Sequence, residues 1–310
     1  MNLPNHPAVS PVPPLLEEDL ASVMEGERPP GVLRSGFRLW RTRVGLIFVT
    51  ILVAIALFGR YIAPYAESKG IALPNQPPGK TRLPSQFGSG YKGQDVWTRF
   101  LYGGRPILIA ALLATVLALF LGTVIGLVAA YNRGKLDDFL MRAMDVILAM
   151  PQIIAALVVL SMFGATTKVI VLTVGISTAP RIARVVRGTA VSVVERDFVA
   201  AAESLGESKT RILISELLPN VTAPLLVEAN LRLTFSIGVI AGIGFLGFTP
   251  DPSAANWGLM IYQNKGGIVP NHWGVTLPVA AIALLTIGTG MIGDGISRAT
   301  GGIDRARGDA

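Results

Sequence analysis

The stretch "PILIAALLATVLALFLGTVIGLVAAY", residues 106–131, contains no charged side chain. A helix needs about 20 apolar residues to cross the roughly 30 Å hydrocarbon core of a bilayer, and this stretch is longer than that. The whole chain has a similar character, because 51% of its 310 residues are hydrophobic and 15% are charged. A soluble domain has about 25% charged residues. We therefore expect an integral membrane protein.

Five further apolar stretches are candidates to cross the membrane beside the first. Pro151 lies inside one of them and predicts a kink there, because proline lacks the N–H and clashes with the preceding helical turn. Another reaches sufficient length only if Arg181 and Arg184 lie at the level of the lipid headgroups. The sequence thus predicts an all-α integral membrane protein with six transmembrane helices, the other five at residues 44–59, 146–167, 169–180, 221–248 and 275–293.

The basic residues indicate how these spans are oriented, because Lys and Arg are enriched in the cytoplasmic loops of membrane proteins. If the N-terminus is cytoplasmic, the segments on that side include the turn after residue 131, the connection 181–220 and the C-terminal segment. They hold most of the Lys and Arg residues. We therefore predict cytoplasmic N- and C-termini. This clustering beside the spans explains the net charge of +7 without a nucleic-acid partner.

The connections between spans differ in composition. Within the long first loop, "YKGQDVWTRFLYGG" at 91–104 mixes aromatic and charged residues, which predicts a helix lying at the membrane interface. Trp257 and Trp273 are expected to anchor the outer interface. The predicted segments are a flexible cytoplasmic tail at 1–36, a first transmembrane region at 37–64, an extracytoplasmic loop with the interfacial helix at 65–105, a five-helix core at 106–295 and a cytoplasmic tail at 296–310.

One polar connection, "FVAAAESLGESKTRILISELLPN" at 198–220, has residues that typically end and start helices at the spacing of a helical hairpin. Gly206 is a natural helix stop, since glycine takes the left-handed conformation at little cost. Ser208 can cap the next helix, and Pro219 is expected to interrupt the hydrogen-bond ladder of that helix. The segment is either an ordinary cytoplasmic connector or a docking element, whose small residues let another protein approach the backbone closely.

Several kinds of chemistry are not supported by the sequence. The chain has no cysteine, and its two histidines, His6 and His272, lie far apart. A thiolate or catalytic zinc site is therefore not expected. The stretch "LGESKT" at 205–210 lacks the glycines of a nucleotide-binding P-loop. We expect no catalytic residue, metal or cofactor, and we expect that the chain hydrolyses no ATP itself.

Two charged residues lie inside the predicted fifth span. Glu228 and Arg232 are four residues apart and therefore share one helical face. Pairing is expected, since an unpaired charge in a membrane is costly. The pair is interpreted either as a structural ion pair or as a contact in a transport pathway or gate.

The hairpin resembles the cytoplasmic "EAA" coupling-helix loop of ATP-binding-cassette importer permeases, whose pattern is EAA-x3-G-x9-I-x-L-P. Ala200 replaces the usual glutamate, and Glu216 stands at the isoleucine position. The matching residues are Ala201, Ala202, Gly206, Leu218 and Pro219.

Other stretches resemble the dipeptide/oligopeptide permease C-subunit group in the same order along the chain. They include "GQDVWTRFLYGGRPILIA", "AAYNRGKLDDFLMRAMDVILAMPQII" and "GFLGFTPDPSAANWGLMI". The likeness extends from about Phe37 to the C-terminus.

This resemblance implies a permease subunit of the bacterial inner membrane that forms half of a pathway for peptides or similar small solutes. Its implied partners are a homologous second permease subunit, two ATPase subunits, an extracytoplasmic solute-binding protein and the lipid bilayer. The alternatives are an ion-coupled secondary transporter, for which we find no inverted repeat, and an intramembrane enzyme. The positions implied to couple to the ATPases are Ala200, Ala201, Ala202, Glu203, Ser204, Gly206, Glu207, Leu218 and Pro219.

Overall fold

The computed structural model describes residues 40–308, with side-chain surroundings for residues 40–298. The predicted tail at 1–36 lies outside the described residues. Helices dominate the described part, and η1 is a π-helix and η2 a 3-10 helix. In chain order the elements are α3 (Trp40–Ile62), α4 (Val96–Asn132), α5 (Lys135–Ala149), α6 (Gln152–Phe163), α7 (Thr167–Val194), α8 (Asp197–Ser204), α9 (Lys209–Arg211), η1 (Ile212–Leu217), α10 (Leu218–Phe245), α11 (Trp257–Asn264), η2 (Lys265–Gly267) and α12 (Trp273–Gly308).

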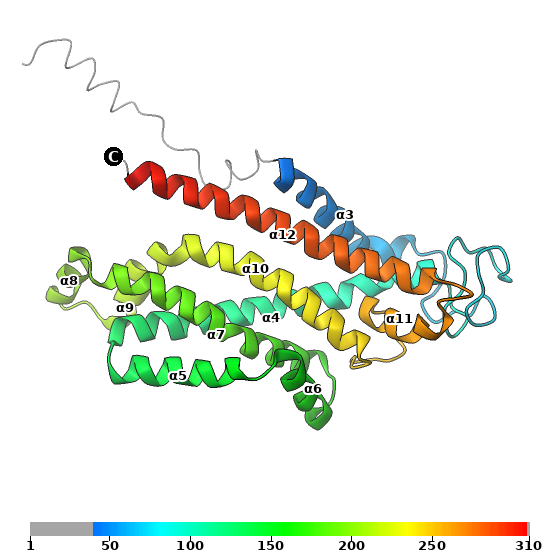
Figure 1. The fold of residues 1–310 in the computed structure, drawn as a ribbon, viewed down its shortest axis with the longest axis horizontal. Coiled ribbons are helices and arrows are strands. Elements are labelled where there is room, and N and C mark those ends of the chain that lie inside the picture. Colours follow the sequence, from blue (N-terminus) through cyan, green and yellow to red (C-terminus); the bar gives the residue numbers. More distant parts are fainter. Residues whose placement is uncertain (1–39, 309–310) are drawn as a thin grey trace, which may run out of the picture.

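The predicted all-α membrane fold is confirmed. Among the described residues, five helical segments are long and apolar enough to cross a membrane, and the bent pair α5–α6 makes a sixth if it is counted as one span. The long helices run side by side, as Figure 1 shows. The helix α8 lies at one end of the bundle, which we call the hairpin end, and α11 lies with the long first loop at the opposite loop end.

The contact between α4 and α7 is made by small residues. A Cβ added at Gly122 would lie 2.6 Å from the Cβ of Ile182, and one added at Gly126 would lie 2.7 Å from the carbonyl oxygen of Ala183. Such approach brings the two backbones together, the packing mode that small residues provide in membranes. The small residues recur at every fourth position of α4 and are all buried, at Ala114, Ala118, Gly122, Gly126 and Ala130. We call this row the α4 seam.

The first and last spans are joined in the same way. A Cβ at Gly45 of α3 would lie 2.6 Å from the carbonyl oxygen of Gly288 in α12. The helix α10 contacts α4, α7 and α12 and therefore lies in the middle of the bundle.

At the loop end, a tryptophan is part of the core. Trp257 is fully buried, and its Nε1–H donates to the carbonyl oxygen of Phe100 at 2.8 Å. Gly103 and Gly104 make room for its ring, because a Cβ at either would lie within 2.8 Å of a ring carbon. The expectation that Trp257 anchors the membrane interface is therefore wrong. Trp273 is half-buried and meets Phe87 edge to face.

No separate helix forms within 91–104, where an interfacial helix is predicted. Residues 96–104 instead form the first turns of α4 and continue without a break through Pro106. The Asp95 carboxylate caps this helix, since its Oδ2 accepts at 2.7 Å from both the N–H and the hydroxyl of Thr98. Phe100 and Leu101 are buried against the core, so this segment does not lie on the surface of the bundle.

The predicted kink at Pro151 is a complete break. The helices α5 and α6 meet at an angle of 84°. Met150 is extended, with φ −86° and ψ 130°, as expected for a residue before proline. The amphipathic α5 then lies along α7, held by ion pairs between Asp137 and Arg187, at 2.5 Å, and between Asp145 and Arg184.

The fourth and sixth spans are longer than predicted. The helix α7 runs on through Pro180, Arg181 and Arg184 to Val194, so the basic residues continue the helix that the apolar stretch begins. The helix α12 extends through most of the predicted C-terminal tail at 296–310.

We predict opposite effects of the same substitution at two helical glycines. Gly122→Ala places a methyl group against α7 and should lower the stability by about 1–3 kcal/mol through overpacking. Gly188→Ala, on α7, meets open space and should be neutral or stabilising by up to about 1 kcal/mol, because alanine favours helix. Thermal unfolding midpoints in detergent would measure both. A Gly122→Ala variant as stable as the native chain would contradict the seam.

Candidate functional site

The hairpin begins with α8, which ends as the sequence predicts. Gly206 is in the left-handed region with φ 77°. The N–H of Gly206 donates to the carbonyl oxygen of Glu203 at 3.0 Å. The N–H of Glu207 donates to the carbonyl oxygen of Ala202 at 3.1 Å. These two bonds form a Schellman motif, which satisfies the last carbonyls of a helix and reverses the chain. A residue with a Cβ would be strained at this position.

The second half of the hairpin joins α10 directly. The Ser208 hydroxyl accepts from the N–H of Arg211 and caps α9, as predicted. The π-helix η1 follows, with the N–H of Leu218 bonded to the carbonyl oxygen of Leu213. Pro219 has no N–H and therefore leaves the ladder without that bond, as predicted, but the helix does not end there. The wider π turn precedes this proline, which has no N–H and would clash with the carbonyl of residue 215 in a regular α-helix. Residues 209–245 are consequently one continuous rod.

The hairpin turns one face to the bundle and one outward. Val199 and Ala202 are buried in an apolar cluster that also contains residues of α4, α7 and η1, whereas Leu205 is 82% exposed. Phe198, on the same helix, is 37% exposed. Of the positions expected to couple, Ala202 is buried, Glu207 and Leu218 are half-buried, and the exposed ones are Ala200, Ala201, Glu203, Ser204, Gly206 and Pro219.

Polar contacts fix the hairpin to its neighbours. The Tyr131 hydroxyl at the end of α4 lies close enough to the Glu203 carboxylate to interact with it. Arg133 pairs with Glu195, just before α8, at 3.2 Å. Within the hairpin, Glu207 pairs with Arg211 at 3.4 Å. The base of the hairpin is therefore held by α4 and α7, while its outer face has no cover among the described residues.

Glu228 and Arg232 form the ion pair that the sequence predicts. The Nε–H of Arg232 donates to Oε2 of Glu228 at 2.8 Å, and the two side chains are only 12% and 11% exposed, Arg232 first. The guanidinium also lies 5.5 Å from the ring centroid of Phe235. The pair thus sits in the bundle, half-way along α10.

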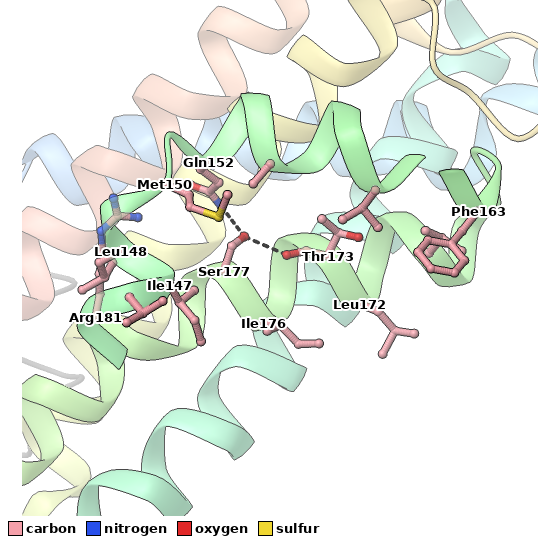
Figure 2. Close-up of a pocket in the computed structure, with 14 residues that line it drawn as sticks. Ile147, Leu148, Met150, Gln152, Phe163, Leu172, Thr173, Ile176, Ser177 and Arg181 are labelled. Atoms are coloured by element: carbon pink, nitrogen blue, oxygen red, sulfur yellow. Dashed lines mark hydrogen bonds between the residues drawn. The ribbon is translucent and has the colours of Figure 1, made fainter. Parts of the chain in front are cut away.

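Two cavities flank the broken helix α6. One, of about 490 Å³, is mostly apolar and lies between α5, α6 and α7 (Figure 2). The Gln152 amide there donates to the hydroxyls of Ser177 and Thr178, both at 3.1 Å, and so ties the start of α6 to α7. The other cavity, of about 450 Å³, lies between α6, α7 and α10 and is lined by Pro151, Gln152, Ile153, Arg181, Arg232, Phe235 and Val239. We call it the arginine cavity.

A third cavity, of about 690 Å³, opens at the loop end between α11 and the loop before it. Asp251 lines it, and the carboxylate accepts from the hydroxyl and the N–H of Ser253 at 2.6 and 2.8 Å. These two bonds lower the pKa of Asp251, with a smaller contribution from the positive charge of Arg99. The loop-end surface therefore keeps this negative charge at neutral pH.

The sequence matches a known family over more than half of its length. Residues 122–300 match the family described as "Binding-protein-dependent transport system inner membrane component". This chain belongs to that family. Residues 42–78 match a second description, "N-terminal TM domain of oligopeptide transport permease C", which covers much of α3 and the start of the first loop.

Curated relatives of this family cover most of the chain. A putative peptide transport system permease protein of Brucella suis is 35% identical over 82% of this chain and 85% of its own. The dipeptide transport system permease protein DppC of Alkalihalophilus pseudofirmus is 34% identical over 82% and 83%. The glutathione transport system permease protein GsiD of Shigella dysenteriae is 31% identical over 81% and 82%.

A solved structure shares the fold. A chain of the MetNI methionine ABC transporter in an inward-facing conformation superposes with a TM-score of 0.54 at 20% identity, covering 65% of this chain and 96% of that one. As a family member, the present chain is a multi-pass permease subunit of an importer in the bacterial inner membrane, and it is not itself the catalytic subunit. Membership implies ATPase partners, a second permease and a binding protein.

We predict that the ion pair in α10 is costly to break but can be replaced as a unit. Glu228→Gln leaves the Arg232 guanidinium without its partner and should cost about 3 kcal/mol of stability. The double variant Glu228→Leu with Arg232→Met should recover most of that loss. Thermal unfolding in detergent measures both. As a control, Arg133→Gln removes an exposed pair and should cost under about 1 kcal/mol. A stable Glu228→Gln variant would show that the pair contributes little.

Proposed function

We propose that this chain forms half of the translocation pathway of an ATP-binding-cassette importer and that ATPase subunits operate it through the 197–220 hairpin. The observation that carries the proposal is the outward face of α8 at one end of a continuous helical rod. A partner that binds this face and moves it can therefore displace residues in the middle of the bundle.

The outward face of α8 has the features of a helix that docks in a groove. Ala200 and Ala201 keep it thin, so that a partner can approach the backbone. Leu205, at 82% exposure, supplies an apolar anchor, and Glu203 and Ser204 supply polar contacts at the rim. Interfaces of this kind take most of their binding energy from a few buried anchors.

The path of transmission follows from the continuity of residues 209–245. Because η1 and α10 form one rod, a displacement of the hairpin moves the Glu228–Arg232 pair and the wall of the arginine cavity. We propose that nucleotide-driven closure of the ATPases moves this rod and so opens the pathway alternately to each side.

The orientation and partners complete the proposal. Both termini and the hairpin end face the cytoplasm, in keeping with the basic residues at that end. A homologous second permease subunit supplies the other half of the pathway, two ATPase subunits dock from the cytoplasm, and a binding protein delivers solute to the loop end. The names of the relatives, a dipeptide and a glutathione transport permease among them, favour peptides as the solutes.

We predict that a bulky residue at Gly206 uncouples ATP hydrolysis from transport. Gly206→Val forces a β-branched residue into the left-handed region and should distort the end of α8. Membrane insertion should persist, while solute-stimulated ATPase activity and uptake should fall by about tenfold or more, since 1.4 kcal/mol of lost docking is a factor of ten.

The matched control is Gly134→Val. Gly134 also has a positive φ, 64°, and has open space around it, but it lies in the turn between α4 and α5. The substitution should also strain the backbone, because Gly134 has φ 64° and ψ −138°, which residues with a Cβ rarely adopt, and it should leave coupling intact. Unchanged uptake in Gly206→Val, or equal loss in both variants, would count against docking at the hairpin.

The same proteoliposome assay separates this proposal from a secondary transporter. Uptake should require the ATPase subunits and ATP. Uptake driven by an ion gradient in their absence would reject the importer mechanism.

A further inference from the structure

The arginine cavity contains two arginines, one from α7 and one from α10. The helices α7 and α10 have 28 residues each, and Arg181 and Arg232 lie half-way along them. Both line the cavity, together with the first residues of α6. Ionisable residues inside membrane spans are rare because they are costly, and they commonly mark a substrate pathway.

The two arginines differ in how their charge is balanced. Arg232 is neutralised by Glu228 at 2.8 Å. Arg181 forms no ion pair or hydrogen bond with any residue that the structure describes, although its neighbours on the same helix, Arg184 and Arg187, both pair with aspartates of α5. Arg181, which is exposed and also lines the apolar cavity, therefore brings to the arginine cavity a positive charge that has no ion pair among the described residues.

The surroundings of Arg181 are held in place. The Gln152 amide, bonded to Ser177 and Thr178, fixes the start of α6 beside α7, and Figure 2 shows Arg181 at the same end of α6, near Leu148. The first N–H groups of α6 have no side-chain cap, so the helix end adds a smaller positive potential of the same sign. Phe235 and Val239 provide an apolar wall opposite.

We infer that Arg181 binds the terminal carboxylate of the transported peptide and that the arginine cavity is a solute site on the pathway. A guanidinium presents a planar fork of donors that matches a carboxylate. A volume of about 450 Å³ is in the range of small-molecule sites, and the apolar wall can cover a side chain. This inference rests on the proposed function as a peptide importer.

Cysteine chemistry tests the charge of the cavity without requiring transport. The chain has no cysteine, so Ile153→Cys places its only thiol in the cavity wall. In membrane vesicles that contain the complete importer, the anionic sulfonatoethyl methanethiosulfonate should react faster than the cationic trimethylammonioethyl reagent, after each rate is divided by its rate with a free thiol. Adding Arg181→Gln should lower this ratio about five- to tenfold.

The matched control is Arg184→Gln in the same Ile153→Cys background. It removes an equal charge from the next turn of α7, but its guanidinium faces Asp145, and it should leave the ratio nearly unchanged. A ratio insensitive to Arg181→Gln, or equally sensitive to both, would overturn the anion site. The absence of any preference for the anionic reagent would also overturn the anion site. That result is expected if an acidic side chain of the second permease forms an ion pair with Arg181.

Uptake then tests the class of solute. Proteoliposomes with the complete importer receive an equimolar mixture of tripeptides as free acids and as C-terminal amides, and mass spectrometry measures the internal content. The native importer should favour the acids, and Arg181→Gln should reduce this preference about tenfold. An unchanged preference would overturn the carboxylate role alone. No ATP-dependent uptake of any peptide by the native importer would overturn the peptide class in both proposals, while the cysteine rates would still decide whether the cavity binds anions.

Discussion

The close approach of α4 to α7 is the constraint on which the rest of this structure depends. Small residues at every fourth position of α4 allow backbone contact where larger ones would hold the helices apart. In a bilayer, apolar surface gains little from leaving lipid, so such packing carries much of the association. Since α7 leads into α8, the seam also fixes the base from which the hairpin projects.

The hairpin and the cavity are connected by helical continuity rather than by a chain of side chains. The Schellman motif at Gly206 and the cap at Ser208 set the angle of α8 against the rod 209–245. The π-helix η1 lets the rod pass Pro219 without a break. On the other side of the cavity, α6 is separated from α5 by the 84° break at Pro151. The rod 209–245, which we propose moves, therefore lies across the cavity from α6, and Gln152 hydrogen-bonds the start of α6 to α7.

Local features of this fold are predictable from the sequence, and distant contacts are not. The stop at Gly206, the cap at Ser208 and the Glu228–Arg232 pair all depend on residues a few positions apart, and each appears as predicted. The apolar spans are also present, although two of them are longer than predicted and one is broken. Trp257 was misassigned because the glycines that receive its ring, Gly103 and Gly104, lie far away in sequence. The break before α6 was underestimated because a proline shows where a helix is disturbed but not by what angle. Hydropathy also cannot show that α7 continues past Arg181 beside a cavity.

The central claim is that an ATPase grips the exposed face of α8 from the cytoplasm. The most direct measurement uses Leu205→Cys, which gives this cysteine-free chain one thiol on that face. A membrane-impermeant maleimide should label it in inside-out vesicles stripped of ATPase subunits, and adding those subunits back should protect it. Labelling of right-side-out vesicles, or labelling in inside-out vesicles that the ATPase subunits do not reduce, would contradict the account.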